Sequence, residues 1–123
     1  MGSWDGLNRR KFPRVSYPCL IKLANSEETL LTHTENLGIG GVCIVIKHNL
    51  KPFTEVNVEV DMLDTGDHIQ CPGRVVWNVR RKAIEEDKPN FYDIGIEFVD
   101  LSEEDRERID LVVKRLLKLG KGV

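Results

Sequence analysis

The sequence contains few cysteines, and they do not form a recognisable pattern. Three are present among 123 residues, namely Cys19, Cys43 and Cys71, and they are widely separated. An odd number at this spacing indicates neither a disulfide framework nor a zinc site. Because each lies among apolar residues, we expect all three to behave as small buried hydrophobic side chains.

Long apolar runs are also absent. No segment approaches the roughly 18 consecutive apolar residues that a membrane-spanning helix requires, so we expect a soluble chain without a membrane span. The first residues, Met1 to Gly6, lack the basic start and apolar stretch of a secretory signal. A cytoplasmic location is therefore expected.

A constellation of catalytic residues is missing as well. His33, His48 and His68 are isolated in the sequence from a second metal ligand or a nucleophile. No nucleophile, base and orienting acid can be assigned to sensible positions. We therefore predict that the chain is not an enzyme and carries no metal or cofactor.

Positive charge is scarce on the predicted strands. The net charge is −2, and the basic residues near the start form one short cluster. A protein that coats nucleic acid would interleave basic and aromatic residues on a sheet face, whereas one strand here carries Asn57, Glu59 and Asp61. We expect a local basic site, and neither DNA nor RNA as a partner.

Alternation of apolar and polar residues with a period of two dominates the middle of the chain and indicates half-buried strands. The predicted strands are 15–23, 28–34, 42–47, 56–62, 69–80 and 92–98. Turn residues separate them, including Gly38 to Gly41, and short connections favour antiparallel neighbours. Closing such a sheet removes its exposed edges. The prediction is an all-β, six-stranded antiparallel barrel of the split-barrel type.

A single helix is predicted after the last strand. Ser102 can cap it and Asp105 follows three residues later, while Ile109, Val112 and Leu116 belong to an apolar stripe at helical spacing. We expect this helix to pack on the barrel. The predicted organisation is a flexible segment at 1–8, one domain at 9–119 and a tail at 120–123, with a polar loop at 82–90.

A cationic cluster precedes the first strand and contains Arg9, Arg10 and Arg14. Phe12 and Pro13 within it disfavour a helix, so an extended arm is expected. The planar guanidinium group is suited to bidentate contacts with phosphate and with the O6 and N7 edge of guanine. Read alone, the cluster is better explained as a solvated basic arm.

A glycine-rich segment, Asn36 to Gly41, connects the second and third strands. Its three glycines permit positive φ and close approach of a backbone, and Asn36 offers an amide oxygen to a ring N–H donor. The glycine spacing differs from that of a dinucleotide fingerprint, and the segment leads into a strand instead of a helix. Read alone, it is an ordinary glycine-rich turn.

Together, the two clusters resemble the signature of the PilZ family, RxxxR followed by [D/N]xSxxG. Arg10 and Arg14 match the first part, and Asn36 and Gly41 match the second. The resemblance extends over about residues 8 to 118, including the closing helix. It implies a cyclic di-GMP site on the outside of the barrel, formed by Arg10 and Arg14 with the Asn36 to Gly41 turn, and a further contact from Arg9.

Gly38 departs from the family pattern because it occupies the usual serine position. A missing hydroxyl removes one hydrogen bond, typically worth about 0.5–1.5 kcal/mol. Asn36 lies within the pattern but lacks the charge that aspartate would provide to guanine donors.

Trp77 has two possible roles. It could stack on a ligand, but it shares parity with Ile69, Cys71 and Val75, which favours core packing.

The resemblance implies a cyclic di-GMP receptor. We predict that its arginine arm becomes ordered on ligand binding and that the resulting surface signals to an unidentified protein partner. The alternative is a degenerate PilZ domain that binds a protein and no nucleotide.

Overall fold

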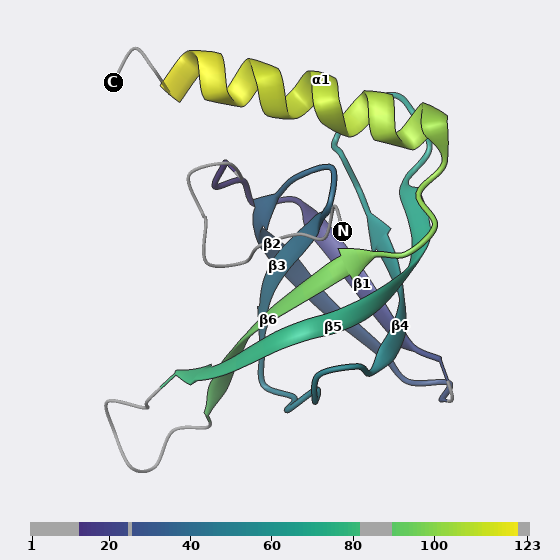
Figure 1. The fold of residues 1–123 in the computed structure, drawn as a ribbon, viewed down its shortest axis with the longest axis vertical. Coiled ribbons are helices and arrows are strands. Elements are labelled where there is room, and N and C mark those ends of the chain that lie inside the picture. The colour runs from purple at the N-terminus through teal and green to yellow at the C-terminus, as the bar shows by residue number, and fades with distance from the viewer. Residues whose placement is uncertain (1–12, 25, 82–89, 121–123) are drawn as a thin grey trace.

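Six antiparallel strands form a closed barrel in the computed structural model, which describes residues 13–24, 26–81 and 90–120 (Figure 1). The strands are β1 (Pro18–Leu23), β2 (Thr29–Leu37), β3 (Gly41–Ile46), β4 (Glu55–Val60), β5 (Ile69–Arg81) and β6 (Phe91–Phe98). Around the barrel they follow the order β1-β2-β3-β6-β5-β4, and β4 pairs with β1 to close it. The predicted fold class is confirmed.

One short connection does not join neighbouring strands. Strand β3 pairs with β2 and β6, whereas β4 pairs with β1 and β5. Residues 47–54 therefore join two strands that are not neighbours in the barrel. The expectation that short connections join antiparallel neighbours is wrong here and correct for the other strand connections. Within this connection Phe53 has a φ of 74° and an 80% exposed side chain.

The barrel interior is filled by the apolar residues of the period-two pattern, because alternate side chains of a strand point to opposite faces. The fully buried members include Ile21, Val42, Ile44, Val60, Val75, Ile94 and Ile96. All three cysteines are buried and free, as expected. Burial raises the pKa of the Cys19 and Cys71 thiols to about 12, so both remain protonated at neutral pH.

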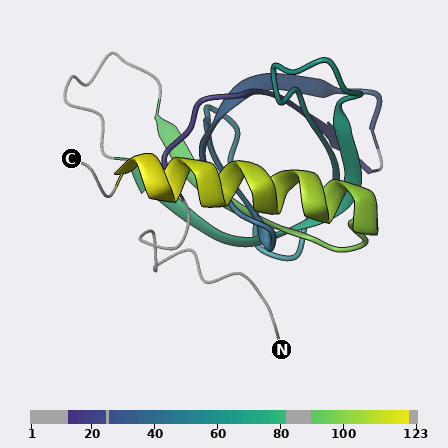
Figure 2. The same cartoon turned by 90° about the horizontal axis from the view of Figure 1, so that it is seen from above.

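Helix α1 (Glu103–Gly120) lies across one end of the barrel (Figures 1 and 2). Ser102 caps it as predicted, since its Oγ accepts a hydrogen bond from the Asp105 amide at 3.1 Å. Ile109 is completely buried, and Val112 and Val113 pack against the same core. The helix therefore covers one barrel opening with its apolar face and leaves the opposite face outward.

Two further features concern the described residues only. The described part of the chain contains no helix that is both long enough and apolar enough to cross a membrane. Within the same ranges, no group of three or more histidine, cysteine, aspartate or glutamate side chains is arranged to hold a metal ion.

Candidate functional site

The residues before β1 lie along β2 and extend the sheet at that point. We call residues 13–17 the arm from here on, and of the predicted arginine arm they contain Arg14. Its backbone is held by hydrogen bonds from the Val15 amide to the Glu35 carbonyl at 3.1 Å and from the Leu37 amide to the Pro13 carbonyl at 3.3 Å. The Thr34 hydroxyl also donates to the Val15 carbonyl and accepts from the Tyr17 amide. Arg14 is thereby fixed beside Asn36, with which it forms an isolated antiparallel bridge.

Asn36 lies within β2 and not in the turn that follows. The predicted strand ended at Thr34, whereas β2 continues to Leu37 with a register shift between Thr34 and Asn36. Polar Glu35 and Asn36 resemble turn residues in the sequence, but their backbones are paired with the arm and with β3. The side chain of Asn36 is only 4% exposed.

A line of paired residues crosses the outside of the barrel from the arm to β5. Arg14 pairs with Asn36, Asn36 with Cys43, Cys43 with Gly95, and Gly95 with Trp77. We call these five residues the outer row. Directly opposed residues share one face of a sheet, and the chain neighbours of Cys43 are fully buried inside the barrel, so the outer row faces outward.

Trp77 reaches this outer face because of a β-bulge. Val75 opposes Ile96 and Trp77 opposes Gly95, so Val76 is an additional residue on β5. The extra residue reverses the parity of the strand, and the core position that parity predicted for Trp77 is wrong. Its side chain is half-buried and lies outside the main hydrophobic cluster.

The predicted glycine turn is present, but its glycines do not act through positive φ. Gly38 and Gly41 exchange hydrogen bonds of 3.0 and 3.3 Å, which leaves Ile39 and Gly40 as the loop. None of the described glycines has a positive φ, so the turn does not use this conformational freedom. Gly41 is required by a close approach, because a Cβ there would lie 2.2 Å from the Ile96 carbonyl oxygen on β6.

Charged side chains surround the outer row. The Arg14 guanidinium contacts the Glu35 carboxylate at 3.3 Å, and the Arg14 side chain is 83% exposed. The Arg81 guanidinium contacts Asp93 at 2.9 Å, and this hydrogen bond raises the pKa of the arginine. Of these two arginine side chains Arg14 is the more exposed, at 83% against 49% for Arg81.

The predicted site residues are partly brought together. Arg14, Asn36 and Trp77 share the outer row, while Gly38 and Gly41 close the hairpin that follows Asn36. Arg9 and Arg10 lie outside the described residues, as do the segment 1–8 and most of the predicted loop at 82–90. Four strand spacings of about 4.8 Å place the backbone of Arg14 at most about 19 Å from that of Trp77 along the sheet.

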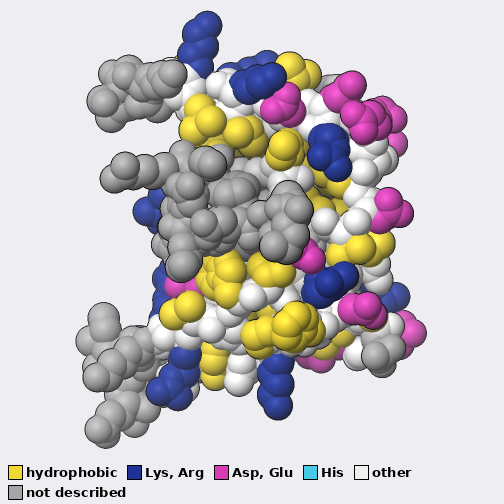
Figure 3. Space-filling view, in the orientation of Figure 1, with side chains coloured by type: hydrophobic (Ala, Val, Ile, Leu, Met, Phe, Trp, Pro, Cys, Tyr) yellow, Lys and Arg dark blue, Asp and Glu magenta, His cyan; other side chains and the backbone are white. Residues whose placement is uncertain are grey.

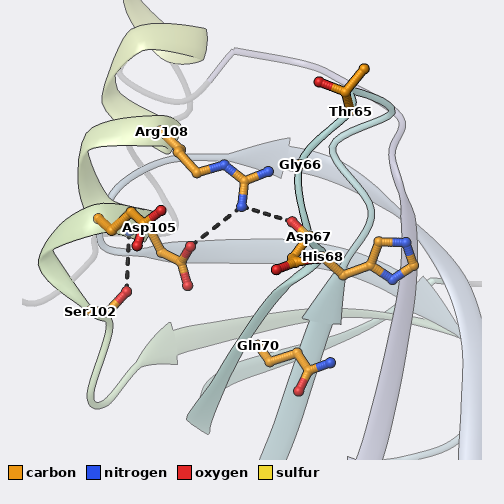
Figure 4. A pocket seen from close by; sticks show the side chains of 9 residues that line it. Thr65, Gly66, Asp67, His68, Gln70, Ser102, Asp105 and Arg108 are labelled. Carbon is orange, nitrogen blue, oxygen red and sulfur yellow. Dashed lines mark hydrogen bonds and ion pairs between the residues drawn. The ribbon is translucent and has the colours of Figure 1, made fainter.

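A hollow between α1 and the β4–β5 connection was not predicted from the sequence (Figure 4). Arg108 projects into it and donates to the Asp67 carbonyl at 2.7 Å, to Asp64 at 3.1 Å and to Asp105 at 3.4 Å. A backbone hydrogen bond from Gly66 and the Arg108 guanidinium lower the pKa of Asp64. These contacts join the helix to the connection, so we assign Arg108 a structural role. In the sequence, this role is indicated only by the position of Arg108 next to Ile109, a residue of the predicted apolar stripe.

Comparison with known proteins places this geometry in a family. The sequence matches the PilZ domain family over residues 8–115. A comparison with curated protein sequences finds no match.

Solved structures share the fold at low sequence identity. The PilZ domain of YcgR from Escherichia coli, solved with c-di-GMP, has a TM-score of 0.65 and 18% identity over 87% of this chain and 86% of that domain. MrkH from K. pneumonia has a TM-score of 0.71 and 18% identity, and the match covers 89% of this chain and 48% of MrkH. PlzA from Borreliella burgdorferi, in complex with c-di-GMP, has a TM-score of 0.59 and 9% identity over 92% of this chain and 47% of PlzA. The chain therefore spans about half the length of the last two proteins.

One conclusion accounts for the six-stranded barrel, the closing helix and the motif residues that meet on the outer face: the chain belongs to the PilZ family.

Proposed function

We propose that this domain is a receptor for cyclic di-GMP that binds the messenger across the outer row. The observation that carries the proposal is the bridge between Arg14 and Asn36. Each belongs to a different half of the PilZ signature, and the arm brings them together on the outside of the barrel. Family membership and the resemblance to the YcgR domain solved with c-di-GMP support the same ligand.

The residues at the two ends of the outer row, Arg14 and Trp77, would contact different parts of the ligand. Cyclic di-GMP carries two phosphates and two guanines, and the guanidinium of Arg14 can contact either group in a bidentate manner. An anionic ligand would displace the weak, solvent-exposed ion pair with Glu35. Trp77, at the far end of the row, offers a ring on which a purine can stack.

Asn36 and the glycine hairpin supply the remaining contacts. Because Asn36 is buried, its amide becomes available to a guanine only when the side chains that cover it move. Gly38 lacks the serine hydroxyl of the family signature, so affinity is expected to be below that of a domain with the complete motif.

Signalling is proposed to use the chain that precedes Pro13. Pro13 and Arg14 are already held on β2 by backbone pairing, so ordering by the ligand would concern Arg9, Arg10 and the residues before them. The output would be a surface formed by arm, ligand and barrel and presented to an unidentified protein. We propose no catalytic role, and a cytoplasmic location remains a prediction.

Calorimetric titration of cyclic di-GMP into wild type and Arg14→Ala tests the site. Hydrogen bonds to charged groups are worth about 1.5–3 kcal/mol, so Kd should rise at least about tenfold. Arg106→Ala is the matched control, because Arg106 is an exposed arginine on α1. Trp77→Ala should weaken binding more than Trp77→Phe, which keeps an aromatic face.

The titration also separates the receptor from the alternative. Equal affinity of Arg14→Ala and wild type would refute the site. Failure of the folded wild type to bind the nucleotide would refute the receptor and favour a degenerate PilZ domain that binds a protein.

A further inference from the structure

The outward face of α1 carries a line of residues whose charges change sign about its midpoint. Ile109 points into the core, and at 100° per residue Leu111 points almost directly away from it. The residues that share the direction of Leu111 are Glu104, Glu107, Leu111, Arg115 and Lys118. All five are exposed, and we call them the outer stripe.

The charges of the outer stripe are complementary to those of a second, antiparallel copy of the same stripe. Glu107 and Arg115 stand at equal distances on either side of Leu111, and Glu104 and Lys118 do so further out. In an antiparallel pair of such helices centred on Leu111, each carboxylate faces a cation of the other copy. A parallel pair would place like charges together.

In Figure 3 most acidic side chains at the top of the molecule lie towards the N-terminal end of the helix and basic ones lie towards its C-terminal end, although a basic side chain also lies beside the acidic group. The helix macrodipole by itself favours this order of charges. It does not account for Leu111, a 66% exposed apolar side chain at the point of symmetry.

The described elements leave room for a partner on this face. Helix α1 lies across the end of the barrel with the strands behind it in Figure 2, so a second barrel can approach with its own helix foremost. The stripe from Glu104 to Lys118 is about 21 Å long at 1.5 Å per residue. With a helix diameter of about 10 Å, this face covers about 210 Å², which is less than the roughly 800 Å² per partner of a standard interface, so association should be weak and concentration-dependent.

We propose that the outer stripe of α1 is a self-association surface through which two copies of this chain pair by antiparallel helix packing. The pairing is isologous, with Leu111 meeting its symmetry copy between two Glu107–Arg115 ion pairs. It depends on neither the arm nor a nucleotide. Because its charges are exposed, added salt weakens the dimer as the Debye length falls from about 10 Å at 0.1 M to 3 Å at 1 M.

Charge reversal provides the test, by sedimentation equilibrium of the full chain without nucleotide over a wide concentration range. Wild type is expected to shift towards the dimer mass as concentration rises. Glu107→Lys and Arg115→Glu are each expected to remain monomeric, because each places like charges opposite one another twice. An equimolar mixture of the two variants is expected to regain the dimer. In the mixed pair the introduced lysine of one variant faces the introduced glutamate of the other, and the unaltered Glu107 faces the unaltered Arg115.

Glu27→Lys is the matched control, because Glu27 is an exposed glutamate in the β1–β2 connection. It is expected to associate as wild type does. Circular dichroism establishes that each variant is folded. A wild type that stays monomeric throughout, reversals that leave association unchanged, or a mixture that stays monomeric would each overturn the proposal.

Discussion

Replacing Gly41 by alanine tests whether this signature glycine is needed for the barrel itself. A Cβ at Gly41 would lie 2.2 Å from the Ile96 carbonyl oxygen and 3.1 Å from the Glu97 Cα. Both atoms belong to the backbone of β6, which pairs with β3 on one side and β5 on the other. The obstruction therefore cannot be relieved by rotating a side chain, and the strands must separate locally.

The expected cost follows from overpacking at a well-packed contact, which is typically about 1–3 kcal/mol. Unfolding entropy of about 2.1 cal/mol/K per residue gives about 0.26 kcal/mol/K for the 123-residue chain. Gly41→Ala should consequently lower Tm by about 4–12 °C. The loss should appear in the urea midpoint without a change in slope.

Gly66→Ala is the control for this measurement. A Cβ there would lie 2.8 Å from Nη2 of Arg108, the far end of a flexible side chain that can move aside. We expect a clearly smaller loss of Tm than for Gly41→Ala, since the interactions at risk are the surface contacts of one flexible guanidinium group with Asp64, Asp67 and Asp105. If the two variants melt together, or if Gly41→Ala melts with wild type, the close approach of β3 and β6 is not what requires glycine.

Two further predictions concern the binding turn and pH. Gly38→Ser should lower Kd for cyclic di-GMP about two- to thirteenfold by restoring one hydrogen bond, whereas Gly38→Ala should not, and equal titrations for the two variants would contradict a role for the hydroxyl. His68 forms a 2.8 Å hydrogen bond with Glu59, which raises the pKa of the imidazole above 6.5, with Asp61 adding to the effect. Its protonated form therefore stabilises the fold fully below pH about 6.5, and this contribution is lost as pH rises through the folded pKa. His68→Gln should reduce the difference between urea midpoints at acidic and alkaline pH, and an unchanged difference would show that the histidine is not responsible.

The sequence predicted the barrel well because its strands are half-buried and therefore alternate. The Ser102 cap, the hairpin at Gly38 to Gly41 and the buried cysteines followed from local chemistry in the same way. The proximity of Arg14 and Asn36 came from the family signature, since neither residue has a sequence pattern that points to the other. The bridge between them supplies that connection.

Where the structure differs from the sequence-based predictions, the cause is a tertiary contact that the alternation of apolar and polar residues does not reveal. Pairing with the arm and β3 extends β2 through Asn36, although the local residues read as a turn. The sequence left open which property of glycine the turn needs, and at Gly41 it is the close approach to Ile96 and not a positive φ. The exchange of pairing partners between β3 and β4 depends on closure of the whole sheet, which no local pattern encodes.

Val76, the extra residue of the bulge, determines which side chains in the rest of β5 face outward. If β5 kept all its residues but paired without the bulge, Trp77, Val79 and Arg81 would turn from the outside of the barrel to the inside, and a guanidinium group would then require a place among isoleucines. A relative that lacks one residue here can keep the same side chains on the outside with a regular strand. Alignments of this strand therefore compare equivalent positions only when the bulge is matched first.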